Sequence, residues 1–384
     1  MPNGVHLLEE VGSLDAFKPV GGRFTESQVA QGIELIINAK RLPSHVHEYM
    51  LREAITTSDF PLLFGVIVEN ELLAHYRATV PDWTAYCKQG TRPNFNQHTI
   101  HQRTGLSNLL PEVSEKGEYL VAAPNAQHWH IQLKKWGQQF DISWEALIND
   151  GMGAFSDVAQ QFAEAAVSTE AFNVTSLFVV AAGPNPLLFG APIATTLDDG
   201  TVVNVTNQGA LALTIGNLQL TRALMAAQTD PTTGRPLGIK MRHLVVPDAL
   251  EDTARSILTS EFQQWTDTAA ATNFPLPTRS IIPQLGLQLH VNSEIDVIDA
   301  SGNDAGTWYA FADTAQGWAM EYDRLRGHET PEVCMKASDK VSTTGAPLGP
   351  FTGDFATDNV FYRVRMVGAG CQLDSRYAYA QVHT

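Results

Sequence analysis

Charged side chains are scarce in this chain of 384 residues, making up 17% of it against about a quarter in a typical globular protein. A chain with so few charges either buries much of its surface in its own cores or covers it with partners. The charges that are present favour acids, with 41 Asp and Glu against 25 Lys and Arg, and the net charge is -16. No block of lysine or arginine occurs, which argues against a protein that holds nucleic acid through its phosphates.

Cysteine and long apolar runs are also rare. Cys87, Cys334 and Cys371 are odd in number and show no paired spacing, which argues against a disulfide framework or a Cys-x-x-Cys metal site. The opening MPNGVHLLEE has no basic segment followed by an apolar one, and no apolar run is long enough to span a membrane. We therefore expect a cytoplasmic, reducing origin.

Phosphate-binding and nucleophile motifs are absent too, since the sequence contains no GxxxxGK, GxSxG or helix-opening GxGxxG. The strongest candidate for a catalytic or metal site is a set of three close histidine pairs: His45 with His47, His98 with His101, and His128 with His130. Two histidines that face the same side of a strand can contribute to a zinc site, but further ligands and an HExxH motif are missing. Polar-face histidines are the simpler interpretation, and a histidine-dependent metal hydrolase is kept as a remote alternative. We expect no catalytic residue, metal or cofactor.

One long amphipathic helix dominates the patterns that are present. From residue 143 to about 171, apolar residues recur with the three-then-four spacing of a single buried stripe. The side chains expected in the core along this stripe include Trp144, Leu147, Ile148, Phe155 and Phe162. Such a helix is long enough to organise a large part of the subunit.

A polar segment with strand-like alternation precedes this helix. The turn-like PNAQ between EYLVAA and HWHIQL predicts an extended hairpin within residues 91–142. Because a two-stranded hairpin is marginally stable alone in water, we expect a neighbouring subunit to cover it. The predicted anchors at that neighbour are Trp129, Ile131, Leu133 and Trp136.

The remainder of the chain is typical of an α+β fold. Residues 208–228 predict a second helix, MRHLVVP predicts a short buried strand, and ALEDTARSILTSEF predicts a helix after it. The segments GTWYAFAD, GWAMEYD and NVFYRVRMVGAGCQLDSRYAYAQV predict further strands near the C-terminus. Asp198-Asp199-Gly200 lacks the alternation of a calcium loop and indicates a tight turn.

In their order along the chain, these segments resemble the major capsid proteins of tailed bacteriophages, which have the Hong Kong 97-type fold. The resemblance lies in DFPLLFG, the EKGEY stretch, a strand ending in a WG step, the ISxxxLINDxxxAF helix start, RHLVVPDALEDTA, GTWYAFAD, the GHETPE turn and DNVFYRVRMVGAGCQLD. It covers roughly residues 55 to 384 and rests on packing patterns rather than on a chemical signature. The first residues match least well.

The resemblance implies a division of the chain into named parts. These are an N-terminal arm over 1–55, the first part of the P-domain over 56–90, the E-loop β-hairpin over 91–142, the spine helix and P-domain over 143–207, the A-domain over 208–318, and over 319–384 the closing strands of the P-domain with a return to the A-domain.

The resemblance also implies a function. The chain would be a structural subunit, not an enzyme, that self-assembles into pentamers and hexamers of an icosahedral capsid around double-stranded DNA. Implied partners are other copies of itself, scaffolding and portal proteins, and possibly decoration proteins, with no membrane and no sequence-specific contact to DNA. It would be found in the virion after assembly in the host cytoplasm. An encapsulin-like bacterial nanocompartment shell protein, with an enzyme cargo, remains an open alternative.

Overall fold

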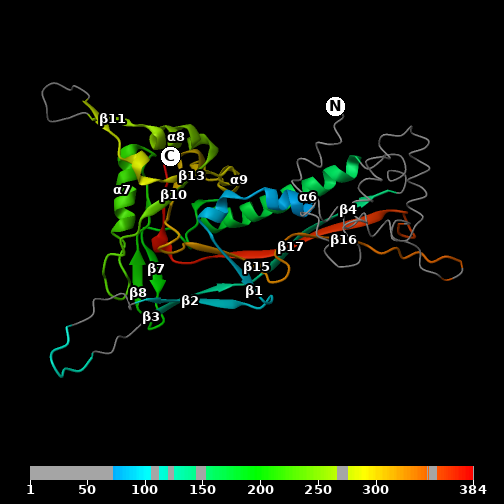
Figure 1. The fold of residues 1–384 in the computed structure, drawn as a ribbon, viewed down its shortest axis with the longest axis horizontal. Helices are drawn as coiled ribbons and strands as arrows, with labels where there is room; N and C mark the ends of the chain where they lie inside the picture. The colour runs from blue at the N-terminus through cyan, green and yellow to red at the C-terminus, as the bar shows by residue number, and fades with distance from the viewer. Residues whose placement is uncertain are drawn as a thin grey trace. The chain divides into compact units, whose positions relative to one another are not determined.

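The structure is a computed structural model in which the chain forms two compact units. The residues that it describes are 72–104, 112–119, 125–143, 153–265, 276–343, 345 and 353–383. The first unit comprises Met1–Val80, Lys134–Thr169 and Arg326–Gly368, and the second comprises Pro81–Leu133, Glu170–Leu325 and Ala369–Thr384. The chain therefore passes between the units several times (Figure 1). The predicted arm over 1–55 lies outside the described residues.

The first unit is built around the long strand β17 (Val360–Gln372), most of which lies in this unit. Strand β4 (Lys134–Ile142) pairs with it antiparallel from Val360↔Ile142 to Gly368↔Lys134. Strand β16 (Glu332–Met335) pairs antiparallel with β17 as well. Because side chains alternate along a strand, this arrangement sends Tyr362, Val364 and Met366 to one face of the sheet.

That face is apolar and packs under helical residues. Helix α6 (Gly153–Phe178) and the helical residues 72–78 contribute to its core. The buried cluster consists of Leu72, Leu73, Ala163 and Val364, with Tyr76, Phe162 and Val333 partly buried against it. Phe140 of β4 stacks on Tyr362, with ring centroids 5.1 Å apart, and lies 4.9 Å from the ring of Phe162.

The second unit contains a five-stranded mixed sheet in the order β13-β10-β14-β18-β9. Its strands are β13 (Gln288–Val291), β10 (Met241–Val246), β14 (Trp308–Ala312), β18 (Ala378–Gln381) and β9 (Gln208–Gly209). β10 is parallel to β13 and antiparallel to β14, and β14 is antiparallel to β18. All five residues of β14 are buried, as expected for a strand that is covered on both faces.

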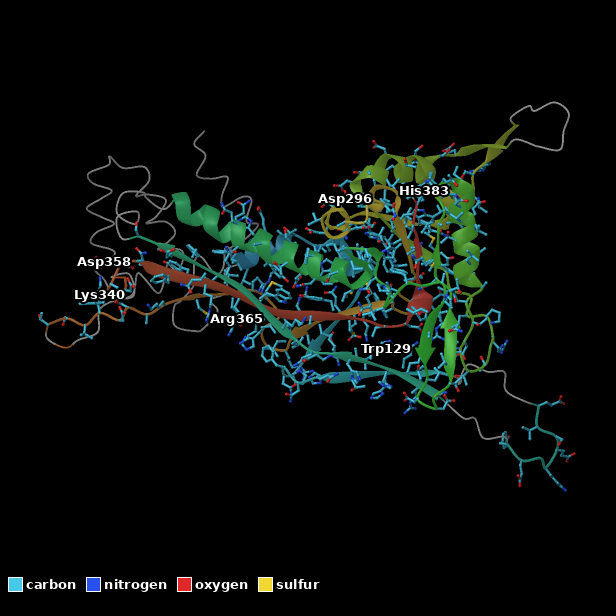
Figure 2. All side chains as sticks on the ribbon, turned by 180° about the vertical axis from the view of Figure 1, so that it is seen from behind. Trp129, Asp296, Lys340, Asp358, Arg365 and His383 are labelled. Atoms are coloured by element: carbon cyan, nitrogen blue, oxygen red, sulfur yellow. The ribbon has the colours of Figure 1, made fainter. Side chains whose placement is uncertain are left out.

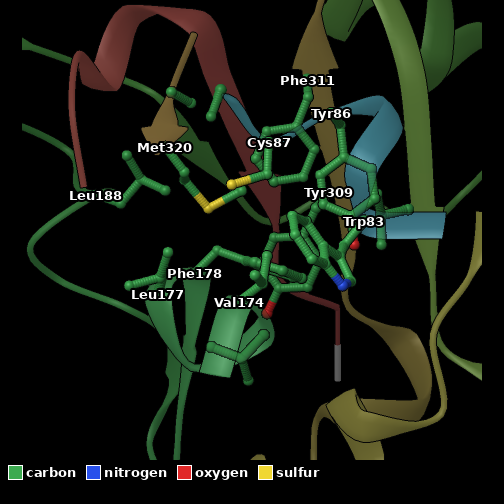
Figure 3. Packing of buried hydrophobic residues seen from close by; sticks show 14 of the residues in the cluster. Trp83, Tyr86, Cys87, Val174, Leu177, Phe178, Leu188, Tyr309, Phe311 and Met320 are labelled. Carbon is green, nitrogen blue, oxygen red and sulfur yellow. The ribbon is translucent and has the colours of Figure 1, made fainter. Parts of the chain in front are cut away.

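Alternate residues of this sheet enter two different cores. On β14, Tyr309 and Phe311 belong to one cluster, together with Phe178 from the end of α6 (Figure 3). Trp308 and Ala310 belong to the other cluster. That second cluster takes in residues of α7 (Ile215–Ala226) and α8 (Glu251–Thr259), so that helices cover both faces of the sheet.

Short elements complete the second unit. Its remaining strands are β1 (Lys88–Arg92), β2 (His98–Thr104), β3 (Asn125–Ile131), β5 (Val179–Val180), β6 (Gly183–Pro184), β7 (Ile193–Thr196), β8 (Val202–Val205), β11 (Phe262–Trp265), β12 (Leu276–Arg279) and β15 (Met320–Leu325). Its remaining helices are α9 (Glu294–Ile298) and the 3₁₀ turns η2 (Asp82–Ala85), η3 (Asp248–Leu250), η4 (Ile282–Leu285), η5 (Asp304–Gly306) and η7 (Ser375–Tyr377). β1 runs parallel to β15, and β2–β3, β7–β8 and β11–β12 are antiparallel pairs.

The hairpin has a different strand partner from the one predicted. Strand β3 pairs with β2, from His98↔Ile131 to Thr104↔Asn125, and residues 120–123 of EYLVAA lie outside the described residues. Asn125, Ala126 and Gln127, which PNAQ placed in a turn, lie within β3. The turn residues misled the prediction because a short polar stretch can also begin a strand when a distant segment offers the hydrogen bonds.

Two helix boundaries also differ. α6 ends at Phe178 rather than at Ala171, because Val174, Leu177 and Phe178 continue the apolar spacing into a core of the second unit. α7 begins at Ile215 rather than at residue 208, after Thr214, whose side chain accepts a hydrogen bond from the backbone N–H of Asn217. That bond is an ordinary N-cap, and it fixes where the helix starts.

Candidate assembly surfaces

The β2–β3 hairpin presents two chemically different faces. One face carries Thr99 and His101 of β2 opposite His130 and His128 of β3. The three histidines are exposed. The other face carries Ile100 opposite Trp129, and Gln102 opposite Gln127, which is 3% exposed. The hairpin thus buries one face in its own unit and leaves a polar face open.

A buried ion pair bonds to both strands of this hairpin, near the end at which they lead into their connection. Arg376 donates two hydrogen bonds to Asp374, from Nε to Oδ1 at 2.7 Å and from Nη2 to Oδ2 at 2.6 Å. The same Nη2 donates to Gln127 Oε1 at 3.1 Å, and Gln102 Nε2 donates to Asp374 Oδ2 at 3.4 Å. Arg376, Asp374 and Gln127 are each 3% exposed. Because both strands contribute a glutamine to one ion pair, charge-assisted bonds fix this end of the hairpin to its own unit.

The predicted anchor Trp129 lies half-buried on β3, on the face that carries Gln127 (Figure 2). It lines a cavity of about 190 Å³ together with Ile193, Thr195 and Asp374. This volume is smaller than the roughly 300–1,000 Å³ of small-molecule sites. The cavity is therefore smaller than a typical small-molecule site, and the contact of Trp129 with a neighbour stays a prediction.

The other predicted anchors have contacts within their own chain. Ile131 and Leu133 are 2% and 4% exposed. Trp136 lies half-buried on β4, and its Nε1–H donates to the carbonyl oxygen of Gly368 on β17 at 3.1 Å. In the subunit these three side chains stabilise the fold, and any further role at a neighbour stays a prediction.

The predicted core residues of the long helix are only partly within the described chain. Phe162 is half-buried on α6 and packs against the core of the first unit. Phe155 lies on α6. Trp144, Leu147 and Ile148 lie outside the described residues, so their burial stays a prediction.

The histidines are brought together without forming a metal centre. His128 Nδ1 lies 2.7 Å from Asp198 Oδ1, and His130 Nδ1 lies 3.2 Å from Thr99 Oγ1. Asp198 belongs to the predicted tight turn, in which Gly200 N–H donates to the carbonyl of Leu197. Within the described ranges, no group of three or more His, Cys, Asp or Glu residues is placed to hold a metal ion. His45 and His47 lie outside those ranges.

A second buried charge cluster lies between the parallel strands β1 and β15. Glu321 and Asp323 are 3% and 0% exposed. Arg92 bridges them, with Nη2 2.9 Å from Glu321 Oε1 and Nε bonded to Asp323 Oδ2. Lys88 Nζ donates to Glu321 Oε2 at 2.9 Å. Burial raises the pKa of Asp323 to about 6, against the lowering effect of Arg92.

Neither ion-pair cluster was predicted from the sequence, although each left a signal. Asp374 and Arg376 stand two residues apart between two apolar strands, and Glu321 and Asp323 stand in the otherwise apolar GWAMEYD. Charged residues at buried positions need partners. Asp374 and Arg376 pair with each other, whereas the further partners in both clusters come from residues 88–127. A single sequence does not reveal which distant strand supplies them.

Comparison with known proteins decides the family. A sequence model described as "Phage capsid protein" matches residues 130–381, more than half of the chain. The chain belongs to the phage capsid protein family. It is therefore a structural subunit of a capsid shell in the virion, and the resemblance stated from the sequence is confirmed. No curated protein sequence matches this capsid protein significantly.

The chain is also similar to solved structures. The capsid structure of the cyanophage P-SCSP1u has a TM-score of 0.50 to this capsid protein at 10% identity, covering 79% of this chain and 88% of that one. The Microbacterium phage Oxtober96 structure has a TM-score of 0.47 at 8% identity, covering 80% and 92%. The holo-SrpI encapsulin complex from Synechococcus elongatus PCC 7942 has a TM-score of 0.42 at 8% identity, covering 80% and 88%. The predicted mixed α+β fold is confirmed as a capsid-type fold. In the part of the capsid protein that the structure describes, no helix has both the length and the apolar character for a membrane span.

Proposed function

We propose that this capsid protein self-assembles into the pentamers and hexamers of an icosahedral phage shell that encloses double-stranded DNA. The observation that carries this proposal is the family match over residues 130–381. The net charge of -16 supports an enclosing role, because a wall of the same sign as the phosphates lets DNA lie against it without being held.

The parts of the fold have separate roles in this proposal. The β2–β3 hairpin serves as the E-loop, α6 as the spine helix of the P-domain, and the five-stranded sheet with α7 and α8 as the A-domain. The hairpin supports its assignment by leaving its histidine face exposed in the single subunit. α6 supports its assignment because its residues belong to both units, so that one element joins them.

The proposed partners follow from the same role. Other copies of the chain are the main partner, and separate scaffolding and portal proteins, with decoration proteins where present, complete the particle. We propose that assembly takes place in the host cytoplasm and that no catalytic step is required of the subunit.

Negative-stain electron microscopy of the purified chain, alongside size-exclusion chromatography, tests the proposal. Closed shells tens of nanometres across are expected, from the chain alone or after co-expression with a scaffolding protein from the same genome. A small, stable dimer or tetramer that contains stoichiometric metal under both conditions would overturn the proposal. Shells that hold a protein cargo and never package DNA would instead favour the encapsulin-like alternative.

A further inference from the structure

The open face of the β2–β3 hairpin carries three exposed histidines, one on β2 and two on β3, which lie side by side (Figure 1). In the register, His101 is directly opposite His128, and Thr99 is directly opposite His130. His128 and His130 are two residues apart on one strand and therefore point to the same side. The fold thus gathers imidazoles from two separate segments on one surface, and we refer to these four residues as the histidine face.

The ring of His128 is oriented by a carboxylate. Its Nδ1 lies 2.7 Å from Asp198 Oδ1. An ionised carboxylate only accepts hydrogen bonds, so Nδ1 carries the proton in this contact, and in the neutral ring Nε2 keeps a lone pair. Asp198 is itself held in place, because its backbone N–H donates to the carbonyl of Ala126 on β3 at 2.9 Å. The carboxylate and the ring are therefore tied to the same strand.

The ring of His130 has a comparable partner. Its Nδ1 lies 3.2 Å from Oγ1 of Thr99 on the opposite strand. A hydroxyl oxygen can accept a hydrogen bond from Nδ1, which again leaves Nε2 with the lone pair. Histidines that bind metal ions in proteins almost always donate the other ring N–H to an oxygen acceptor. The sequence alone predicts no metal site, because histidine spacing does not reveal that Asp198 and Thr99 orient these rings.

The separation of the two β3 rings suits one metal ion between them. A zinc–nitrogen bond of about 2.1 Å places the ion about 3.2 Å from the centre of an imidazole ring, and two such rings at a tetrahedral angle have centroids about 5 Å apart. The centroids of His128 and His130 are 5.5 Å apart. Those of His101 and His128 are 6.5 Å apart. This longer distance agrees with the finding that no three-residue group in the described ranges is placed to hold a metal ion.

The charges around the histidine face favour a cation. The turn between β7 and β8 contributes Asp198 and Asp199, both exposed. Arg103, which the register places on the same face opposite Ala126, partly offsets them. Two carboxylates attract a divalent cation more strongly than one guanidinium at a similar distance repels it.

We propose that Nε2 of His128 and Nε2 of His130 bind one divalent transition-metal ion, with water completing its coordination. Imidazole nitrogen suits Zn²⁺, Ni²⁺ and Cu²⁺, whereas Ca²⁺ and Mg²⁺ prefer oxygen ligands. Asp198 and Thr99 are positioning residues, because each bonds to the Nδ1 of one ligand ring. The bound ion ties β3 to β2 and to the β7–β8 turn and so stabilises the hairpin. The site lies within one chain and does not depend on the proposed function.

Calorimetric titration of the untagged full-length chain with Zn²⁺ tests the site. The background is Cys334→Ser, because the exposed Cys334 thiol also binds zinc, whereas the other two cysteines are buried. His128→Gln and His130→Gln are each expected to weaken zinc binding at least tenfold. Excess Zn²⁺ should raise the melting temperature of the background chain and not that of His128→Gln. A zinc affinity that stays within twofold in either ligand variant would overturn the proposal.

Two further variants test the orientation of the rings. Asp198→Ala is expected to weaken zinc binding about tenfold. Asp198→Asn keeps an acceptor oxygen and should recover most of that loss. His328→Gln is the matched control, because His328 is also exposed and bonds to a carboxylate, that of Glu332, but belongs to the first unit. Its zinc affinity should stay within twofold of the background, and a loss as large as in His128→Gln would overturn the proposal.

Electron paramagnetic resonance of the chain with one equivalent of Cu²⁺ identifies the ligands directly. Hyperfine splitting from two imidazole nitrogens is expected in the background chain, and splitting from one is expected in His130→Gln. Asp198→Ala should keep both nitrogens at saturating Cu²⁺, because Asp198 positions a ligand and is not one itself. A spectrum with oxygen ligands only, or one that is the same in His130→Gln, would overturn the proposal.

Discussion

Arg376 and Asp374 form a two-point ion pair beside the β2–β3 hairpin, near the end at which the strands lead into their connection, and both residues are 3% exposed. Buried pairs of this kind cost desolvation energy that is recovered only when the geometry is good and the other polar atoms are bonded. Here Gln127 accepts a further hydrogen bond from the guanidinium. The pair fixes the hairpin relative to its own unit more than it adds net stability.

Replacement of one partner should therefore be costly. Arg376→Leu leaves the Asp374 carboxylate buried without its cation, and we expect a loss of about 3–5 kcal/mol in the free energy of unfolding. Denaturant unfolding of the subunit measures this. Arg235→Leu, at an exposed arginine, should change it by less than about 0.5 kcal/mol. The double variant Arg376→Leu with Asp374→Ala should recover part of the loss, and a double variant as unstable as the single one would contradict this account.

Stability should fall in acid because of the buried histidine pair. His243 Nδ1 and His290 Nε2 are 3.1 Å apart, and the two residues are 4% and 8% exposed. Burial lowers the pKa of both, that of His243 to about 4, and each ring stays neutral in the fold. The unfolded chain takes up these protons near its ordinary pKa of about 6.5. The contribution of the neutral histidine pair to the free energy of unfolding is thus fully present above pH 6.5 and is lost as pH falls toward 4.

The melting temperature measured across this window checks the histidine prediction. Burial has raised the pKa of Asp323, so this group acts in the opposite sense and favours the fold as pH falls. A histidine variant separates the effect of the histidine pair from that of Asp323. His243→Asn keeps a polar atom near the place of Nδ1 and should flatten the fall between pH 6.5 and 4. A slope as steep as in the unmodified chain would show that other groups cause it.

Gly90 should tolerate no larger residue. A Cβ at this position would collide with the Asp323 carboxylate, and one at Gly216 would meet nothing within 4 Å. Gly90→Ala is expected to displace Asp323 from Arg92 and to lower the melting temperature by several degrees. Gly216→Ala lies in helix α7 and should raise the free energy of unfolding by about 0.5–1 kcal/mol. Equal effects of the two substitutions would contradict the close packing of β1 against β15.

Trp129→Asp should block assembly without unfolding the subunit. The indole is half-buried on the hairpin. A carboxylate in its place removes apolar surface available to a neighbour. The carboxylate itself can stay hydrated, so the subunit is expected to remain folded. Soluble monomers without shells are expected by size-exclusion chromatography and electron microscopy. Gln132→Asp, an exposed position directly after β3, is the control and should leave shells intact. Normal particles from the tryptophan variant would remove Trp129 from the proposed interface.

The capsid-type fold was predicted from patterns that are local in the sequence. Helix α6 and strands β10 and β14 follow from apolar spacing alone, because each buries a continuous face and needs no particular partner to be identified. The strand-like alternation of this segment likewise matches β3, in which Trp129 is half-buried and Ile131 buried while His128 and His130 are exposed.

What could not be predicted is which distant segments meet. The pairing of β3 with β2 was not predicted, since a two-residue period says which side chains share a face but not which strand lies beside them. The same limit applies to the histidine face. His128 and His130 appear in the sequence as a pair two residues apart, and the partners of their Nδ1 atoms, on Asp198 and Thr99, become visible only in the fold.

The position of β18 in the second-unit sheet has a consequence for synthesis. β18 (Ala378–Gln381) lies between β14 and β9, and β17, the strand that joins β4 to β16, begins only at Val360. Neither sheet can close while those residues are still inside the ribosome. A nascent or prematurely stopped chain lacks a central strand in both units and exposes unpaired edges, which chaperones and proteases recognise. A chain that stops before residue 378 therefore lacks the strand that joins β14 to β9 and keeps two unpaired strand edges in that sheet.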